Sequence, residues 1–241
     1  TIVVARLLTP DDYGIVAMAG LFLGLARLMS EFGLGTTVLA MRELEARSLE
    51  EMNALSLALG SLALLATFGA ALPLGAYFKA PELPLVVCAM GLGFIPAALR
   101  VVPYALLQLA RLEMLGALIT TGSTLLIALS DGGYWALALG PMASGVIVTA
   151  INIRLRPVGL ARPSRQILDA IRVSRNILVE RIAGYGYLSA DTFILGRVLG
   201  QGPLGVYTLA RSLGVIAVDK VTALTMRVSP AIFSAAQHDP A

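Results

Sequence analysis

Residues 53–78 read NALSLALGSLALLATFGAALPLGAYF and contain no charged side chain. The stretch is longer than the roughly 20 mostly apolar residues that an α-helix needs to cross a 30 Å hydrocarbon core. Similar apolar stretches recur along the chain with short polar breaks between them, so a single cleaved signal peptide does not account for them. The stretch therefore predicts a membrane-spanning helix, and its recurrence predicts an all-α chain.

The composition supports the same fold class. Of the 241 residues, 57% are hydrophobic and 14% are charged, and the mean hydropathy is +0.82. This balance is more apolar than that of a soluble domain, whose outer face must stay wet. No long charged or mixed segment is present to form a soluble domain beside a single anchor. We therefore expect a polytopic transmembrane helix bundle with about eight helices.

The apolar stretches give the positions of these helices. The end of a first span lies at 1–8, and the fourth span contains Pro96 and Pro103, which predict a kink. The remaining spans follow from the polar breaks that separate them. The predicted spans two to eight cover residues 13–39, 53–78, 83–109, 114–129, 134–153, 176–199 and 204–227.

Lysine and arginine are distributed unevenly over alternate loops. One side receives Arg6, Lys79 and Arg197, and the other receives Arg42, Arg47, Arg111, Arg154, Arg156, Arg162, Arg165, Arg172, Arg175 and Arg227. The positive-inside rule places the arginine-rich loops in the cytoplasm. The pI near 9.2 is thus explained by the arginines of the cytoplasmic loops. These arginines form no continuous basic face, so we expect no nucleic-acid partner.

The longest polar stretch, residues 154–175, divides the chain. It contains Pro157 and Pro163, and its spacing of Ile167, Leu168 and Ile171 is typical of a surface helix. We interpret it as a cytoplasmic linker with an interfacial helix. It would join an N-terminal transmembrane lobe at 1–153 to the start of a C-terminal lobe at 176–241.

An internal repeat supports two lobes. Residues 5–19, ARLLTPDDYGIVAMA, align with residues 196–210, GRVLGQGPLGVYTLA, at a constant shift, and Arg6, Leu8, Gly14 and Ala19 meet identical residues. Each copy lies between two spans and keeps the same membrane orientation. This is typical of parallel repeats in transporters, whose lobes rock about a central site. We expect six spans per lobe in the intact protein.

Four stretches carry a family resemblance: 5–19, EFGLGTTVLAMRE at 31–43, GGYWALALG at 132–140 and SADTFILGRVLGQGPLGVYTLA at 189–210. In this order they resemble the Wzx-type oligosaccharide flippases of the multidrug/oligosaccharidyl-lipid/polysaccharide exporter superfamily. The chain begins without Met and ends just after a span, so we interpret it as a fragment with one nearly complete lobe and two helices of the next.

The resemblance implies a V-shaped pair of six-helix lobes around a cationic cavity. It implies transport of an undecaprenyl-pyrophosphate-linked oligosaccharide from the cytoplasmic to the periplasmic leaflet of a bacterial cytoplasmic membrane, for surface polysaccharide and lipopolysaccharide biosynthesis. Coupling to a proton or sodium gradient is typical of the superfamily, and no bound cofactor is expected. The implied partners are the lipid-linked oligosaccharide, membrane lipids and other membrane proteins of polysaccharide assembly.

Ionisable residues at membrane depth are functional candidates, because a charge in hydrocarbon is unfavourable unless it faces a cavity or a partner. The candidates for cargo binding are Arg27, Arg100, Arg181, Arg211 and Lys220. The candidates for ion coupling are Glu31, Asp191 and Asp219. Arg6 and Arg197, which occupy matched positions of the repeat, are candidates for a gate between the lobes.

Several of these assignments have an alternative, and Arg100 could instead pair with a residue of a distant helix. Arg27 and Glu31 lie one turn apart and could neutralise each other. Arg181, beside Glu180, could lie at the interface. Asp191 could serve only as a helix-packing hydrogen-bond partner, and the two gate arginines could extend to the lipid headgroups.

Three functions compete. Arginines suit a pyrophosphate cargo, because the guanidinium is planar and stays protonated. A cation-coupled drug or metabolite antiporter would line its cavity with acids and aromatics, and aromatics are only 6% here. A membrane enzyme of polysaccharide assembly is disfavoured, because the chain lacks an Asp-x-Asp motif, a Gly-rich phosphate loop and a large extramembrane loop. Cys88 and His238 are the only residues of their types, and we predict no catalytic or metal site.

Overall fold

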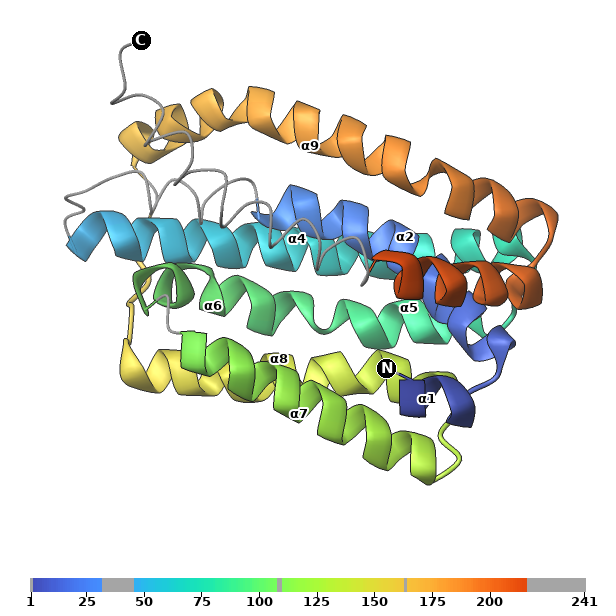
Figure 1. Ribbon diagram of the computed structural model, residues 1–241. Coiled ribbons are helices and arrows are strands. Elements are labelled where there is room, and N and C mark those ends of the chain that lie inside the picture. The colour runs from blue at the N-terminus through green and yellow to red at the C-terminus, as the bar shows by residue number, and fades with distance from the viewer. Residues whose placement is uncertain (1, 32–45, 108–109, 163, 216–241) are drawn as a thin grey trace, which may run out of the picture.

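The computed structural model describes residues 2–31, 46–107, 110–162 and 164–215, and within these ranges it contains helices and no strand. The predicted all-α helix bundle is confirmed (Figure 1). A further helical segment covers 201–215. The labelled helices are α1 (Ile2–Leu7), α2 (Pro10–Glu31), α4 (Ala46–Phe78), α5 (Leu83–Gly91), α6 (Phe94–Leu107), α7 (Ala110–Leu129), α8 (Tyr134–Leu155) and α9 (Arg165–Val198).

The connections between the helices gather at two ends of the bundle (Figure 1). We call one the Arg-poor end; it holds the connections 8–9, 79–82, 130–133 and 199–200 and lies on the right in Figure 1. We call the other the Arg-rich end; it holds the start of α4 and residues 156–162. This arrangement agrees with the alternation of loops on which the predicted orientation rests.

Four described helical stretches are long and apolar enough to cross a membrane, namely Pro10–Ser30, Arg47–Phe78, Leu83–Tyr104 and Tyr134–Leu155. They correspond to the predicted second, third, fourth and sixth spans. The shorter apolar helix Met114–Leu129 corresponds to the fifth. The predicted seventh span falls in α9, which is less apolar than the other long helices. The predicted eighth begins in 201–215 and continues outside the described residues.

The kink in the fourth span lies earlier than predicted. The break between α5 and α6 falls at Leu92 and Gly93, whose N–H groups bond to carbonyls three residues back at 3.2 and 3.1 Å. A proline ring clashes with the carbonyl four residues before it, so Pro96 disfavours a regular helix at Leu92. Pro103 lies inside α6, which continues past it.

Large apolar side chains are exposed along the bundle, as expected of a surface whose solvent is lipid. Examples on α4 and α7 are Leu62, Leu65, Leu72, Leu118 and Leu126. Small residues mark the contact between α7 and α8 instead. The Ser144 hydroxyl donates to the Gly116 carbonyl at 2.8 Å, and the Ser123 hydroxyl donates to the Gly140 carbonyl at 3.1 Å. Close backbone approach and hydroxyl bonds between helices are characteristic of membrane helix packing.

The segment before α9 is fastened to the start of α4. The Asn53 amide donates to the carbonyls of Val158 and Gly159 at 3.1 and 3.2 Å. The Ser164 N–H donates to the Glu51 carboxylate at 2.9 Å, which also lies 3.5 Å from the Arg47 guanidinium. These contacts hold the connection between the two predicted lobes against the Arg-rich end.

The helix that follows is longer than the predicted seventh span. α9 runs without interruption from Arg165 to Val198, so no break marks the predicted boundary at 175/176. The sequence offers no reason for one, because α9 contains neither proline nor glycine before Gly184. The predicted interfacial helix and the predicted span therefore form one element.

Replacing Asn53 with alanine is expected to loosen this connection. The substitution removes two hydrogen bonds, each worth on the order of 1 kcal/mol, so the equilibrium for local opening should rise by about thirtyfold. Limited trypsin digestion of the purified full-length protein would measure it as faster cleavage after Arg154, because Arg156 and Arg162 precede proline and are not trypsin sites. Ser61→Ala is the control, because that hydroxyl bonds only within α4. Equal cleavage rates in both variants would contradict the anchoring role.

Candidate functional site

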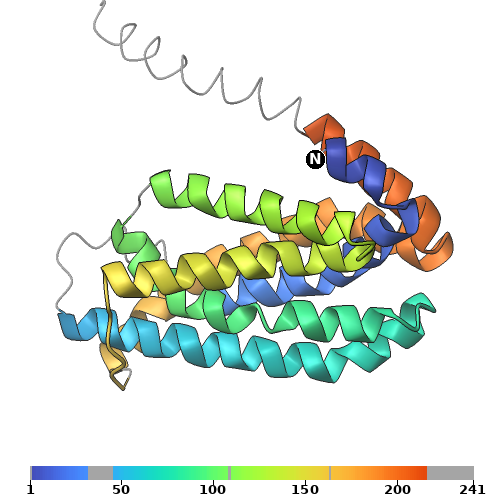
Figure 2. The ribbon, with the colours of Figure 1, turned by 90° about the horizontal axis from the view of Figure 1, so that it is seen from below.

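The two copies of the sequence repeat adopt the same local structure. α1 ends at Leu7 and α9 ends at Val198, while the next helices begin at Pro10 and at residue 201. Both pairs of boundaries are separated by the 191 residues of the sequence shift. Each copy is thus a helix end, a two-residue connection and a helix start. Figures 1 and 2 show both corners at the same end of the bundle.

The two copies contact each other through their backbones. Gly14 lies against the carbonyl oxygen of Gln201, and Gly205 lies against the carbonyl oxygen of Pro10. Pro10 and Gln201 are matched positions of the repeat, as are Gly14 and Gly205. The contact is therefore reciprocal, as in an interface built around a two-fold axis. We call these four residues the glycine contact.

The glycine contact tolerates no side chain at its centre. A Cβ atom at Gly14 or at Gly205 would overlap the facing carbonyl group. Close approach of this kind needs glycine, because only glycine lets two helix backbones come so near. Gly20 in α2 and Gly214 in 201–215 differ, because a Cβ atom there would have nothing within 4 Å. The requirement for glycine therefore applies at the glycine contact and not along these helices in general.

A second contact joins α2 and α9 further from the Arg-poor end. The Tyr185 hydroxyl lies 3.0 Å from the Gly20 carbonyl oxygen and 2.9 Å from that of Leu21, and it donates to this pair. Gly24 lies against the Tyr185 ring, so its lack of a side chain makes room for the tyrosine. α9 is thereby positioned along α2 over about half the length of that helix.

The contact between Tyr185 and Gly24 fixes how α9 and α2 are aligned along their lengths. This alignment brings two of the predicted cargo-binding residues to the same depth in the bundle. Arg181 precedes Tyr185 by one turn of α9, and Arg27 follows Gly24 by one turn of the antiparallel α2. Residues three or four apart share a helix face, so both cations lie on the faces where these helices meet. Both are exposed. Glu31 ends α2, and its side chain lies outside the described residues.

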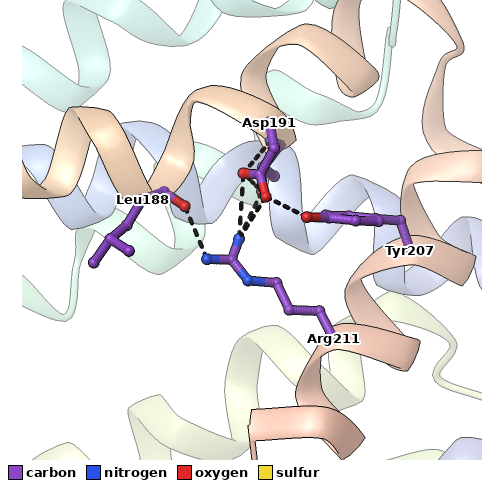
Figure 3. A network of polar contacts seen from close by, with 5 residues as sticks. Leu188, Asp191, Tyr207 and Arg211 are labelled. Atoms are coloured by element: carbon purple, nitrogen blue, oxygen red, sulfur yellow. Dashed lines mark hydrogen bonds and ion pairs between the residues drawn. The ribbon is translucent and has the colours of Figure 1, made fainter.

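A polar network links α9 to 201–215 (Figure 3). The Asp191 carboxylate accepts hydrogen bonds from the Tyr207 hydroxyl and from Arg211, whose Nη1 lies 3.3 Å from both carboxylate oxygens. Arg211 Nη2 also donates to the Leu188 carbonyl at 2.8 Å, and Nη1 lies 3.4 Å from the Thr192 hydroxyl. The structure thus pairs two residues for which the sequence predicted different roles.

The network has a definite chemical character. The Arg211 side chain is 37% exposed and that of Asp191 40%, so the ion pair is accessible from outside the protein. The Arg211 guanidinium that holds the carboxylate is a general receptor for oxyanions. Asp191 makes the helix-packing hydrogen bonds that were one of its two predicted alternatives.

The remaining predicted residues are dispersed. Arg100 is half-buried on α6, in the predicted N-terminal lobe. Arg6 is exposed at the end of α1, whereas the Arg197 guanidinium carbon lies 5.0 Å from the centroid of the Tyr77 ring, a cation–π contact. Asp219 and Lys220 lie outside the described residues.

Sequence reasoning did not identify several partners. Tyr207 and Arg211 are four residues apart in one helix and so share a face, but nothing in their spacing indicates that this face meets Asp191. The repeat marked Gly14 and Gly205 as identical residues, yet it gave no sign that they touch. Tyr185 carries no charge, so the search for ionisable residues at membrane depth did not select it.

Comparisons with known proteins identify the family of the chain. Residues 3–241 match the family described as polysaccharide biosynthesis protein. A curated relative is the lipopolysaccharide biosynthesis protein WzxC of Escherichia coli (strain K12), which is 22% identical over an alignment covering 98% of this chain. The alignment covers 50% of WzxC, so the chain spans about half the length of this relative. No solved structure matches the chain.

Proposed function

Because the chain belongs to the polysaccharide biosynthesis protein family, we propose that it is part of a multi-pass transporter that flips a lipid-linked oligosaccharide. The cargo would be an undecaprenyl-pyrophosphate-linked sugar unit, moved from the cytoplasmic to the periplasmic leaflet of a bacterial cytoplasmic membrane. The name of WzxC, a lipopolysaccharide biosynthesis protein, supports this class of cargo. The Arg-rich end would face the cytoplasm.

The reciprocal glycine contact carries the proposal. Alternating access requires two similar lobes that touch at one end and separate there when the other end closes. The matched corners of the repeat touch at the Arg-poor end through backbone atoms, and the fully buried Leu204 side chain packs in the same hydrophobic cluster as Ile15 and Met18 of α2. Opening this end would expose the two glycines and Leu204, and closing it would bury them again.

The arginines suit the cargo. Arg27 and Arg181 lie on facing helices between the lobes, and Arg211 already holds one oxyanion, the Asp191 carboxylate. A pyrophosphate would take the place of that carboxylate on the Arg211 guanidinium. Asp191, once released, would be available to a proton or a sodium ion, which would couple cargo binding to an ion gradient.

The test uses the full-length protein in cells without another flippase for the same cargo. Arg211→Ala and Arg100→Ala are expected to abolish surface polysaccharide while membrane levels of the protein stay normal. Asp191→Asn should raise cargo affinity, because it removes the carboxylate that competes with the cargo for the Arg211 guanidinium, and it should still lower export. Normal polysaccharide in both arginine variants would reject their roles, and export of cationic drugs would favour the antiporter.

A further inference from the structure

A cavity of about 500 Å³ lies at the Arg-poor end, separate from the Asp191–Arg211 network. Its volume is within the roughly 300–1,000 Å³ range of small-ligand sites. Met18 of α2, the end of α4 with the connection 79–82, and the end of α9 with the connection 199–200 line it. Both predicted lobes therefore contribute to its wall.

The charges in this cavity come from three side chains. Lys79 and Glu82 line it from the connection after α4, and Arg197 lines it from the end of α9. All three are exposed, and together they carry two positive charges and one negative charge. Lys79 has a φ of 56°, in the left-handed region where glycine is favoured. Arg197 is held in place by its contact with the Tyr77 ring.

Aromatic and apolar side chains adjoin these charges. Tyr77 stacks on Phe193 with ring centroids 5.3 Å apart, and Phe78 meets both rings edge-on. Tyr77 and Phe193 are exposed, and Val198 and Leu199 beside them are exposed as well. Aromatic rings next to basic residues at a helix end are typical of the membrane interface. The cavity therefore lies where lipid headgroups meet acyl chains.

We propose that this cavity binds the headgroup of a zwitterionic phospholipid of the phosphoethanolamine type. The phosphate would lie between Lys79 and Arg197, and the primary ammonium would donate to the Glu82 carboxylate. The acyl chains would cover the exposed rings of Tyr77 and Phe193. Because both lobes line the cavity, the lipid would stabilise the arrangement in which they touch at this end.

This ligand is distinct from the proposed cargo. A pyrophosphate carries more negative charge and has no cation for Glu82, so it matches a cavity of net charge +1 less well. A phosphocholine headgroup offers a cation without N–H donors, and a phosphoglycerol headgroup offers no cation at all. The Glu82 carboxylate therefore predicts that the cavity prefers a phosphoethanolamine headgroup to phosphocholine and phosphoglycerol headgroups.

Native mass spectrometry of the delipidated full-length protein would test the proposal, with phosphatidylethanolamine, phosphatidylglycerol and phosphatidylcholine of identical acyl chains. Wild-type protein should retain phosphatidylethanolamine about tenfold better than either competitor, the effect of one charge-assisted hydrogen bond. Equal retention, or preference for phosphatidylglycerol, would overturn the proposal. This comparison requires no variant, so it does not depend on how a substituted protein folds.

Single substitutions then test which residues bind the phosphate and which bind the ammonium of the headgroup. Glu82→Gln should abolish the preference over phosphatidylglycerol, and Lys79→Gln or Arg197→Gln should weaken retention of all three lipids about tenfold. Arg6→Gln is the matched control, because Arg6 is the repeat counterpart of Arg197 but does not line the cavity. An unchanged preference in Glu82→Gln, or an equal loss in Arg6→Gln, would refute the site.

Discussion

Replacing Gly205 with valine is expected to reduce export of the lipid-linked cargo by about fivefold or more. The new Cβ atom would overlap the Pro10 carbonyl, and the helices would have to move apart to relieve the clash. Overpacking of this kind costs about 1–3 kcal/mol, which lowers the population of the closed Arg-poor end by about 5- to 150-fold. Surface polysaccharide, normalised to the protein in the membrane, measures the effect.

The chain provides matched controls for this substitution. Gly14→Val should reproduce the loss, because the contact is reciprocal. Gly214→Val, in the same helical segment as Gly205, and Gly20→Val, in the same helix as Gly14, place the same side chain in open space. Export in these two variants should stay within a few-fold of wild type. Equal losses in all four variants would show that the helices tolerate no valine anywhere and would reject the gate.

A disulfide across the two-fold axis of the contact is expected to stop export reversibly. Asp11 and Gly202 are matched positions of the repeat, and a Cβ atom at Gly202 would stand 3.9 Å from Cγ of Asp11. A cysteine sulfur at position 11 would occupy about the place of that Cγ, so the variant with Asp11→Cys and Gly202→Cys should cross-link under mild oxidation. Cys88→Ala removes the one thiol of this sequence.

Export should fall to background in the oxidised double variant and return on reduction. Each single cysteine variant, treated in the same way, is the control and should keep its activity. A cross-linked protein that still exports would show that the Arg-poor end need not open. Slow cross-linking alongside normal export would show that these two residues do not approach each other in the membrane.

The helices could be predicted from the sequence because apolar length and loop charge depend on the membrane and not on tertiary packing. The position of the kink was predicted less well. Pro96 was identified as its cause, but the helix is broken one turn earlier, at Leu92 and Gly93. The site depends on which helix faces meet. Asp191 and Arg211 are separated by a helical corner, and only the packing of that corner determines that they pair.

The fastening of Val158, Gly159 and Ser164 to α4 has a mechanical consequence. It fixes the start of α9 and makes that helix a lever with its fulcrum near Ser164. With 34 residues, α9 is about 51 Å long at a rise of 1.5 Å per residue, so a swing of about 10° displaces its far end by about 9 Å. That displacement is close to the distance between the axes of two packed helices. A small rotation at the Arg-rich end therefore suffices to part the lobes completely at the Arg-poor end.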